Sequence, residues 1–297
     1  MPKRRGGIAG LARFLEPAPA EDSRPAKKRK TSPEPYDATG LVPHYKDASE
    51  VPEHLQKYFA QRTRFFSLYS TPPGCLLDEE GWYSITPELI ADRIAERCRC
   101  DTILDAFCGV GGNAIAFAKT CERVIALDIS PIRLALARHN AQIYGVADRI
   151  EFILADYISF ANSYLSQSHP QRKIDVVFLS PPWGGPGYIS GDTTRPSSPV
   201  KSSELDQEHP TYSLASIQPI HGADLFALSR KITRNVAYYL PRNTGVDEIG
   251  ALLTCPPIEE MVEIEEQWMS GKLKALCCLF GGLAAAQENL FDQSNVQ

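Results

Sequence analysis

Three acidic residues and one tryptophan motif are the parts of this sequence that could do chemistry. Asp105, Asp128 and Asp156 each come directly after a short apolar run, and the stretch "SPPW", residues 180–183, follows a fourth such run. Carboxylates accept hydrogen bonds from hydroxyl and amino groups. An indole face stacks well against a flat or cationic ligand. Together these residue types predict a nucleotide-type ligand beside the acids and a planar ligand beside Trp183.

A glycine-rich turn follows the first acid in the stretch "LDAFCGVGGN". Gly109, Gly111 and Gly112 would let the backbone approach a ligand and adopt positive φ. The spacing G-x-G-G is not the full G-x-G-x-x-G fingerprint, so the turn alone is equally compatible with a simple connection. Asp128 lies 19 residues after Gly109. An acid at this distance binds the ribose hydroxyls of nucleotide-type cofactors.

Two of these acids also have structural alternatives. Asp128 would stabilise the dipole of a helix beginning at "SPIRLAL", which has Ser130 as its expected N-cap and Pro131 at its first position. Asp156 would cap a helix beginning at "YISFAN". As a ligand contact, Asp156 would accept a hydrogen bond from an adenine amino group. Three acids at three successive strand ends favour a shared ligand, because open α/β sheets bind ligands at that edge.

Strands interleaved with helices would position these residues. The expected strands are 102–107, 123–129, 150–156, 174–180 and 235–241, and the expected helices are 114–120, 130–145, 157–168, 225–233 and 246–254. This alternation predicts an α/β fold with a parallel, doubly wound sheet. Two consecutive strands, 261–269 and 272–280, then predict an antiparallel hairpin at the sheet edge. That ending fits the seven-stranded methyltransferase sheet better than an all-parallel dehydrogenase sheet.

A small helical extension, residues 46–98, precedes the main domain, which we place at 99–283. Apolar spacing predicts a helix over 51–69. A second helix is expected at "TPELIADRIAERC", with Thr86 as its N-cap and Pro87 at its first position.

The first 45 residues are rich in Pro, Lys, Arg, Ser and Glu, so we predict a disordered tail. Residues 1–36 hold nine basic and four acidic residues, which gives them a net charge of +5. Because the whole chain has a net charge of −5, the residues after 36 carry a net charge of −10. The stretch "PAKKRKTSPEP" predicts a nuclear localisation signal, and a solvated basic linker is the alternative. An acidic body argues against wrapping a long nucleic-acid duplex, but it is compatible with recognising one end or one base.

The rest of the sequence predicts a loop and a tail, and it contains no pattern typical of a membrane helix or a metal site. The polar stretch 190–210 predicts a mobile surface loop, and 284–297 a C-terminal tail. No run approaches the ~18 apolar residues of a membrane helix. The eight cysteines form no C-x-x-C pair and no histidine cluster accompanies them, so we expect no metal site and buried thiols in a reducing compartment. They are Cys75, Cys98, Cys100, Cys108, Cys121, Cys255, Cys277 and Cys278.

The tryptophan motif separates two classes of cofactor that both carry adenosine. Amino-group methyltransferases have an Asp/Asn/Ser-Pro-Pro-aromatic motif after the fourth strand, where this chain has "SPPW". Ser180 and the carbonyl of Pro181 would accept hydrogen bonds from an exocyclic NH2, while the Trp183 ring stacks on the base that carries it. Such positioning contributes several kcal/mol, up to ~10, to lowering a barrier. An NAD-dependent oxidoreductase would have no use for this motif.

Five blocks together resemble the trimethylguanosine synthase family of RNA cap guanosine-N2 methyltransferases. They are "KYFAQRTRFF", "EGWYSITPE", "DAFCGVGGN", "SPPWGGPGY" and "KITRNVAYYLPRN". The resemblance covers about residues 54–281. It implies a class I, Rossmann-like, S-adenosylmethionine-dependent methyltransferase sheet. It also implies two successive methyl transfers to N2 of the 7-methylguanosine (m7G) cap of small nuclear and nucleolar RNAs, in the nucleus and nucleolus. By analogy, small ribonucleoprotein proteins are expected partners of a monomeric enzyme.

The resemblance also implies residue roles. Ser180, Pro181 and Trp183 would form the catalytic motif, with Trp183 stacked on 7-methylguanine. The cofactor residues would be Phe66, Thr86, Asp105, Gly109, Gly111, Asn113, Asp128 and Asp156, and the substrate residues Trp183, Lys57, Arg242 and Asn243. Lys57 and Arg242 would meet the cap phosphates.

Structural alternatives remain for three of these residues. Phe66 could pack in the core, Thr86 could cap a helix without contacting a ligand, and Arg242 could pair with an acid. The loop after "GGPGY" is longer than the family leads us to expect, and either Tyr188 or Tyr212, which flank it, could touch the cap.

Three rival functions stay open at this point. A methyltransferase for another amine, such as adenine N6, would need no cationic base. An NAD-dependent oxidoreductase would bind nicotinamide. A catalytically silent cap- or RNA-binding protein would need none of the cofactor acids.

Overall fold

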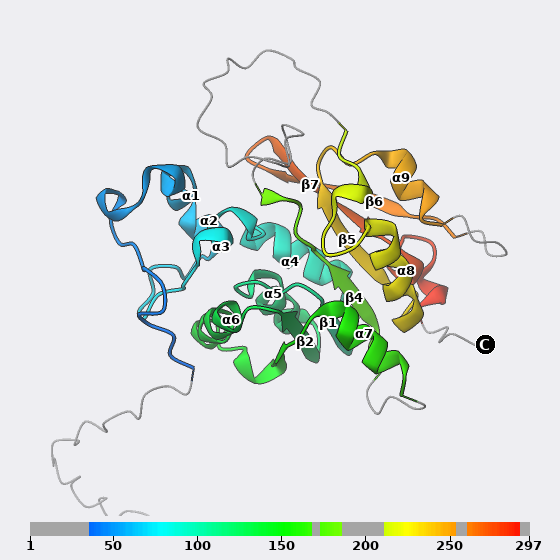
Figure 1. Ribbon diagram of the computed structural model, residues 1–297, viewed down its shortest axis with the longest axis horizontal. Helices are drawn as coiled ribbons and strands as arrows, with labels where there is room; N and C mark the ends of the chain where they lie inside the picture. Colours follow the sequence, from blue (N-terminus) through cyan, green and yellow to red (C-terminus); the bar gives the residue numbers. More distant parts are fainter. Residues whose placement is uncertain (1–35, 168–172, 186–210, 254–259, 292–297) are drawn as a thin grey trace, which may run out of the picture. The chain divides into compact units, whose positions relative to one another are not determined.

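The computed structural model describes residues 36–167, 173–185, 211–253 and 260–291, and a seven-stranded sheet forms its centre (Figure 1). The strand order is β3-β2-β1-β4-β5-β7-β6. The strands are β1 (Thr102–Asp105), β2 (Arg123–Asp128), β3 (Ile150–Leu154), β4 (Val176–Leu179), β5 (Val236–Pro241), β6 (Glu263–Met269) and β7 (Lys272–Leu279). Strands β1 to β5 run parallel to one another, and β7 is antiparallel to its neighbours β5 and β6. The predicted seven-stranded sheet with an antiparallel hairpin at its edge is therefore confirmed.

Helices cover both faces of the sheet. The α-helices are α1 (Gln56–Phe59), α2 (Arg62–Phe65), α3 (Glu79–Ser84), α4 (Glu88–Arg97), α5 (Gly112–Thr120), α6 (Pro131–Ile143), α7 (Tyr157–Leu165), α8 (Gly222–Ile232) and α9 (Val246–Ala251). Short 3-10 turns lie at Ala48–Glu50, Glu53–Leu55, Ala147–Arg149, Leu214–Ser216, Gly281–Leu283 and Glu288–Leu290. None of the described helices is long and apolar enough to cross a membrane.

The two faces of the sheet have separate cores because side chains alternate along each strand. On β4, Val176 and Phe178 belong to one core and Val177 and Leu179 to the other, and all four are fully buried. The first core also contains residues of α4, α5, α6 and the N-terminal extension. The second contains residues of α7, α8 and α9. Burial on both sides explains why this strand is a continuous apolar run.

The N-terminal extension differs from its prediction in two ways. The single helix expected over 51–69 is wrong, because the chain forms the two short helices α1 and α2 with a break at Ala60 and Gln61. Phe59 and Phe65 are six residues apart, which would place them on different sides of one continuous helix. The break lets both rings enter the core, where they are 4 % and 6 % exposed.

The tail is also shorter than predicted. Residues 36–45 are described, and Ala38 is buried, with its N–H donating to Nδ1 of His139 on α6 at 3.2 Å. At the other end of the chain, the buried Gln287 side chain donates to the carbonyl of Met261. The basic stretch before residue 36, the expected loop 190–210 and Tyr188 lie outside the described residues.

Helix starts agree with the sequence at one predicted cap and differ at the other. Ser130 caps α6, with its hydroxyl accepting the Arg133 N–H and Pro131 following it. Thr86 does not cap α4, because that helix begins at Glu88 and Pro87 is still in an extended conformation. A residue before proline is restricted to extended backbone, and Thr86 instead accepts a side-chain hydrogen bond from Asn113.

One buried side chain joins the extension to the sheet. Asn140 of α6 is fully buried; its Oδ1 accepts the Leu76 N–H at 2.7 Å, and its Nδ2 donates to the carbonyls of Leu76 and Val110, each at 2.9 Å. Val110 lies within the glycine turn after β1. This single amide therefore fixes the extension and the turn to the same helix.

Replacing this amide should destabilise the protein. Asn140→Ala leaves three buried backbone groups without a partner, so we expect the free energy of unfolding to fall by about 2–4 kcal/mol. Urea-induced unfolding followed by circular dichroism measures the change. The exposed Asn162 of α7 is the matched control, and Asn162→Ala should shift stability by less than about 0.5 kcal/mol. Equal effects of the two substitutions would refute the assigned role of Asn140.

Candidate functional site

The predicted acids and the tryptophan motif meet at the carboxyl edge of the parallel strands. Asp105 ends β1, Asp128 ends β2, Asp156 follows β3, and Ser180 follows β4. The register places Asp105 opposite Ala126 and Asp128 opposite Leu154. The prediction that these side chains share one edge of the sheet is therefore confirmed.

Among the acids at this edge, Asp105 has the pKa that burial raises furthest. It is fully buried, and neither carboxylate oxygen has a hydrogen bond of ordinary geometry within the described residues. Burial raises the pKa of Asp105 to about 7, the Phe107 backbone N–H opposes this rise, and the nearby Asp128 carboxylate adds to it. A buried carboxylate in this state gains most from a cationic, hydrogen-bonding ligand.

Asp128 holds the glycine turn in place. Its two oxygens accept the N–H groups of Gly109 at 3.0 Å and Ser130 at 2.7 Å. Burial raises its pKa, while these two N–H groups and Arg133 lower it. Ser130 is the N-cap of α6, so the Asp128 carboxylate lies at the N-terminus of that helix, as its structural alternative expected. Each oxygen of Asp128 keeps a second lone pair that can accept a hydrogen bond from a ligand hydroxyl.

The glycines of the turn have different tasks. Gly111 has φ +92°, and a Cβ there would lie 3.1 Å from the Cβ of Ala137 on α6, so it permits close helix packing. Gly109 has φ +52° and open space where its Cβ would be. The open side of Gly109 gives a ligand access to the backbone beside Asp128.

Asn113 and Thr86 join the turn to the extension. Nδ2 of Asn113 donates to Oγ1 of the buried Thr86 at 3.1 Å, and Oδ1 of Asn113 is buried without a partner among the described residues. An unsatisfied acceptor in the first turn of α5, just after the glycine turn, fits a ligand that carries N–H donors. The family resemblance implied a cofactor role for each of these two residues but no link between them.

Asp156 caps α7, as its structural alternative expected. Its Oδ2 accepts the Ser159 N–H at 2.9 Å, and the residue is half-buried. Its Oδ1 makes no hydrogen bond within the described residues. A capping acid can therefore also face a ligand, and its contact with an adenine stays a prediction.

The tryptophan motif follows β4 in a turn. Ser180 Oγ lies 3.5 Å from the Phe107 carbonyl, a long contact, and both residues are half-buried. Trp183 is half-buried, and its ring centroid lies 5.4 Å from that of Tyr239 on β5, with 33° between the planes. The Trp183 carbonyl accepts a hydrogen bond from the Tyr212 hydroxyl at 3.3 Å. One side of the indole is thus supported by a core aromatic residue, which the sequence analysis missed.

The other predicted residues lie on the extension and after β5. Phe66 is 2 % exposed and packs against Tyr144 with ring centroids 5.9 Å apart, so its core-packing alternative is present. Lys57 is exposed, with its Nζ 4.8 Å from the centre of the Tyr58 ring. Whether these two residues meet the cofactor and the cap stays a prediction.

Arg242 and Asn243 lie just past the carboxyl end of β5. Arg242 Nη1 donates to the Leu273 carbonyl at 3.4 Å, and no acidic side chain pairs with it in the described part of the chain. Among the described residues, Arg242 therefore has no acidic partner of the kind that the alternative required. The Asn243 carbonyl accepts the Tyr212 N–H at 2.8 Å.

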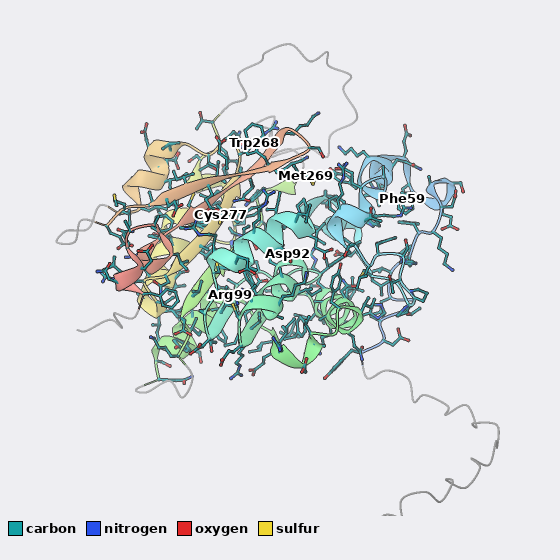
Figure 2. All side chains as sticks on the ribbon, turned by 180° about the vertical axis from the view of Figure 1, so that it is seen from behind. Phe59, Asp92, Arg99, Trp268, Met269 and Cys277 are labelled. Carbon is teal, nitrogen blue, oxygen red and sulfur yellow. The ribbon has the colours of Figure 1, made fainter. Side chains whose placement is uncertain are left out.

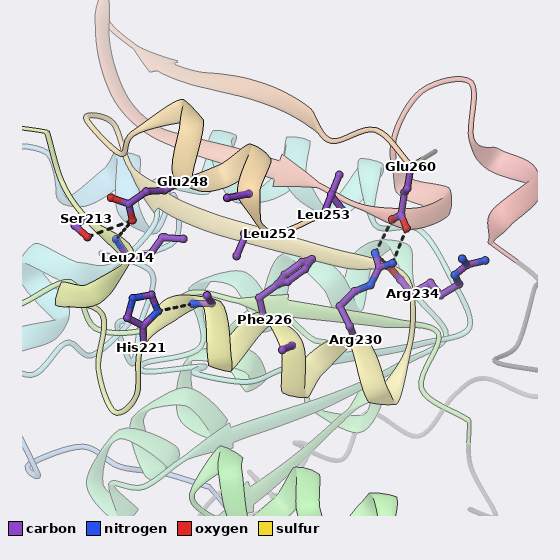
Figure 3. A pocket seen from close by; sticks show the side chains of 13 residues that line it. Ser213, Leu214, His221, Phe226, Arg230, Arg234, Glu248, Leu252, Leu253 and Glu260 are labelled. Carbon is purple, nitrogen blue, oxygen red and sulfur yellow. Dashed lines mark hydrogen bonds and ion pairs between the residues drawn. The ribbon is translucent and has the colours of Figure 1, made fainter. Parts of the chain in front are cut away.

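A pocket of about 670 Å³ lies elsewhere, along α8 (Figure 3). Its charged and polar groups are already paired: Arg230 with Glu260, and Glu248 with the N–H of Leu214. None of the predicted site residues lines it. The candidate site is therefore the carboxyl edge of the sheet, where unsatisfied polar atoms gather.

Comparisons with known proteins find similar sequences over most of this chain. The model of one protein family, RNA cap guanine-N2 methyltransferase, matches residues 100–283. The trimethylguanosine synthase of Schizosaccharomyces pombe is 37% identical over 235 residues, covering 77% of this chain and 87% of that protein. Its counterpart in Saccharomyces cerevisiae is 30% identical over 240 residues, covering 76% of this chain and 67% of that protein.

A solved structure shares the fold. The crystal structure of a putative methyltransferase from Porphyromonas gingivalis has a TM-score of 0.55 and 12% identity, covering 82% of this chain and 56% of that chain. At this identity the likeness supports the architecture of the sheet and nothing about the substrate.

The raised pKa of Asp105 predicts a pH-dependent affinity for S-adenosylmethionine, whose ammonium and sulfonium groups are cationic. Only the ionised carboxylate attracts them, so affinity should fall as pH drops below about 7, by up to about tenfold per unit. Isothermal titration calorimetry between pH 6 and 8 measures this change. Asp105→Asn should bind weakly and without this dependence, whereas the exposed Asp148→Asn should behave like the wild type.

The same substitution should stabilise the ligand-free protein. The pKa of Asp105 is higher in the folded than in the unfolded chain, so its contribution destabilises the fold increasingly as pH rises from about 4 to 7. Asp105→Asn removes that cost and should raise the melting temperature at pH 7.5 by a few degrees. Equal wild-type affinity at pH 6 and pH 8, together with a lower melting temperature for Asp105→Asn, would contradict the assignment.

Proposed function

This chain belongs to the RNA cap guanine-N2 methyltransferase family, and from that premise we propose that it methylates N2 of the m7G cap twice, giving 2,2,7-trimethylguanosine. It is an S-adenosylmethionine-dependent methyltransferase. The observation that carries the proposal is the adjacency of two features at one sheet edge. The buried Asp105 ends β1, and the "SPPW" motif follows the neighbouring strand β4.

The acids and the glycine turn would hold the cofactor. When bound, S-adenosylmethionine supplies an electrophilic methyl group on its sulfonium. Asp105 fits the cationic end of the methionine part because it is buried and has no ordinary hydrogen-bond partner in the described part of the chain. Asp128 fits the ribose hydroxyls, and Asp156 fits the adenine amino group.

The motif after β4 would orient the acceptor amine. Ser180 Oγ and the carbonyl of Pro181 accept the two N2 hydrogens, which fixes the direction of the nitrogen lone pair. Proline stiffens the turn that presents them. No strong base is needed, because the amine proton becomes acidic once the methyl group is attached and leaves after transfer. Positioning is then the main contribution of this chain to the rate.

Trp183 would select the methylated cap. A 7-methylguanine base carries a positive charge, and a cation over an indole face gains roughly 1–2 kcal/mol when desolvated. Tyr239 supports the indole from the core side, so little conformational entropy is lost when a base stacks on it. This preference corresponds to roughly 5- to 30-fold discrimination against plain guanosine.

The physiological RNAs and the location belong to the same proposal. The names of the relatives concern trimethylguanosine, and we extend this to the caps of small nuclear and nucleolar RNA in this chain. The basic stretch "PAKKRKTSPEP" supports a nuclear and nucleolar location. Proteins of small ribonucleoprotein particles are the partners that such substrates imply.

The direct test is methyl incorporation from labelled S-adenosylmethionine into m7GTP or GTP. We expect transfer to m7GTP and little to GTP. Trp183→Ala should lower kcat/KM for m7GTP roughly 100-fold, and Trp183→Phe should lower it less, because a smaller ring still stacks.

A second tryptophan provides the control for this experiment. Trp268 on β6 is 47 % exposed, so Trp268→Ala should leave activity on m7GTP unchanged. Transfer to neither nucleotide by a protein that still binds the cofactor would refute the cap assignment. Transfer to an adenine amine instead would favour the rival amine methyltransferase.

A further inference from the structure

Four basic side chains gather at the turn end of the β6–β7 hairpin. Lys272 and Lys274 begin β7, Arg242 follows β5, and Arg64 lies on α2. The pairing of Pro241 with Ala275 puts Arg242 beside Lys274, and Arg242 Nη1 donates to the carbonyl of Leu273, between the two lysines. Figure 2 shows the hairpin from behind, with Trp268 and Met269 near its turn.

A β-bulge sets the direction of one of these lysines. Gln267 pairs with Ala275, but the next residue, Trp268, pairs with Leu273, so Lys274 is the extra residue of β7. A bulge bends a strand and re-aims the side chain at that position. The turn itself, Ser270 and Gly271, has φ values of 52° and 72°, as a tight two-residue hairpin requires.

Within the described residues, this basic cluster has no acidic counterpart. None of its four side chains pairs with an acid in the part of the chain that the structure describes. Burial lowers the pKa of Lys274, and repulsion from Lys272, Arg242 and Arg64 lowers it further. The rest of the chain after residue 36 carries a net charge of −10. A concentration of unneutralised cations on an acidic body is the electrostatic footprint of an anionic partner.

The basic cluster extends away from Trp183 toward the turn of the hairpin. Tyr239, which supports Trp183, pairs with Cys277, and Arg242 lies three residues farther along the chain. Lys272 lies five residues from Cys277 along β7, or roughly 16 Å. Arg64 and Lys272 are both exposed. The cations therefore lead from the cap side of the site outward to the hairpin turn.

We infer that Arg64 and Lys272 bind the backbone phosphates of the RNA nucleotides that follow the cap. These two side chains extend the row of cations that begins with Arg242 and Lys274. This inference rests on the proposed function, since it takes the cap base to lie against Trp183. Phosphate groups are the anions that a row of Arg and Lys matches. The contact would add affinity for capped RNA over free cap without reading sequence, because phosphates carry no sequence information.

The test compares a short substrate with a long one. Methylation is measured with m7GpppG and with a capped oligoribonucleotide of about ten nucleotides, for wild type and for the double variant R64Q/K272Q. We expect KM for the oligonucleotide to rise roughly threefold to tenfold, while kcat and both parameters for m7GpppG stay unchanged. Lys231→Gln, an exposed lysine on α8, is the matched control and should change neither substrate.

Salt dependence gives a second readout. For single-stranded RNA each lost phosphate contact reduces the slope of log affinity against log salt by about 0.7, so the double variant should reduce it by about 1.4. Fluorescence anisotropy of the labelled oligonucleotide measures this slope without turnover. If wild type fails to methylate m7GpppG, the proposed function falls, and the anisotropy titration still decides the RNA contact.

Two outcomes would overturn the inference. In the first, the double variant binds and methylates the oligonucleotide as wild type does, with an unchanged salt slope. In the second, it loses affinity equally for m7GpppG and for the oligonucleotide, which would place both cations at the cap itself.

Discussion

The fully buried carboxylate of Asp105, which has no ordinary hydrogen-bond partner among the described residues, is the constraint on which the rest of the site depends. Its burial follows from the fold, because β1 is an inner strand covered on both faces. Such a group costs stability unless a ligand satisfies it. The raised pKa of about 7 expresses that cost. The chain keeps an expensive acid at the one place where a cationic cofactor offsets it.

The surrounding network makes this acid useful by fixing the backbone around it. Asp128 accepts the Gly109 N–H, Asn140 holds Val110 and Leu76, and Asn113 donates to Thr86. These bonds tie the glycine turn to β2, to α6 and to the N-terminal extension. The turn is therefore shaped before any ligand arrives, which reduces the ordering cost of binding. On the substrate side, Tyr239 does the same for the indole of Trp183.

Features that depend on local pattern could be predicted from the sequence. The seven strands, the edge hairpin and the Ser130 cap follow from apolar periodicity and from capping chemistry, and the strand-end acids meet because parallel strands share an edge. Features that depend on distant packing could not. The helix over 51–69 breaks because two phenylalanines must enter one core.

The candidate site follows the same division. The identities of the acids and of "SPPW" were visible in the sequence, since each ends an apolar run. The support of Trp183 by Tyr239 requires β4 and β5 to be neighbours, and no local signal in "VAYYLP" marks that tyrosine. The basic cluster around Lys274 depends on a bulge and on three separate elements. The prediction that Thr86 caps α4 is wrong because the helix begins at Glu88, and the Thr86 hydroxyl instead accepts a hydrogen bond from Asn113 of another element.

The atom that receives the methyl group tests the central claim most directly. The protein is incubated with m7GpppG and S-adenosylmethionine carrying a ¹³C-labelled methyl group, and the product is examined by nuclear magnetic resonance. The account predicts two labelled methyl groups, both bonded to the exocyclic N2 of the 7-methylguanine base. Label on any other atom, or on the second guanosine, would contradict the placement of the cap base between Ser180 and Trp183.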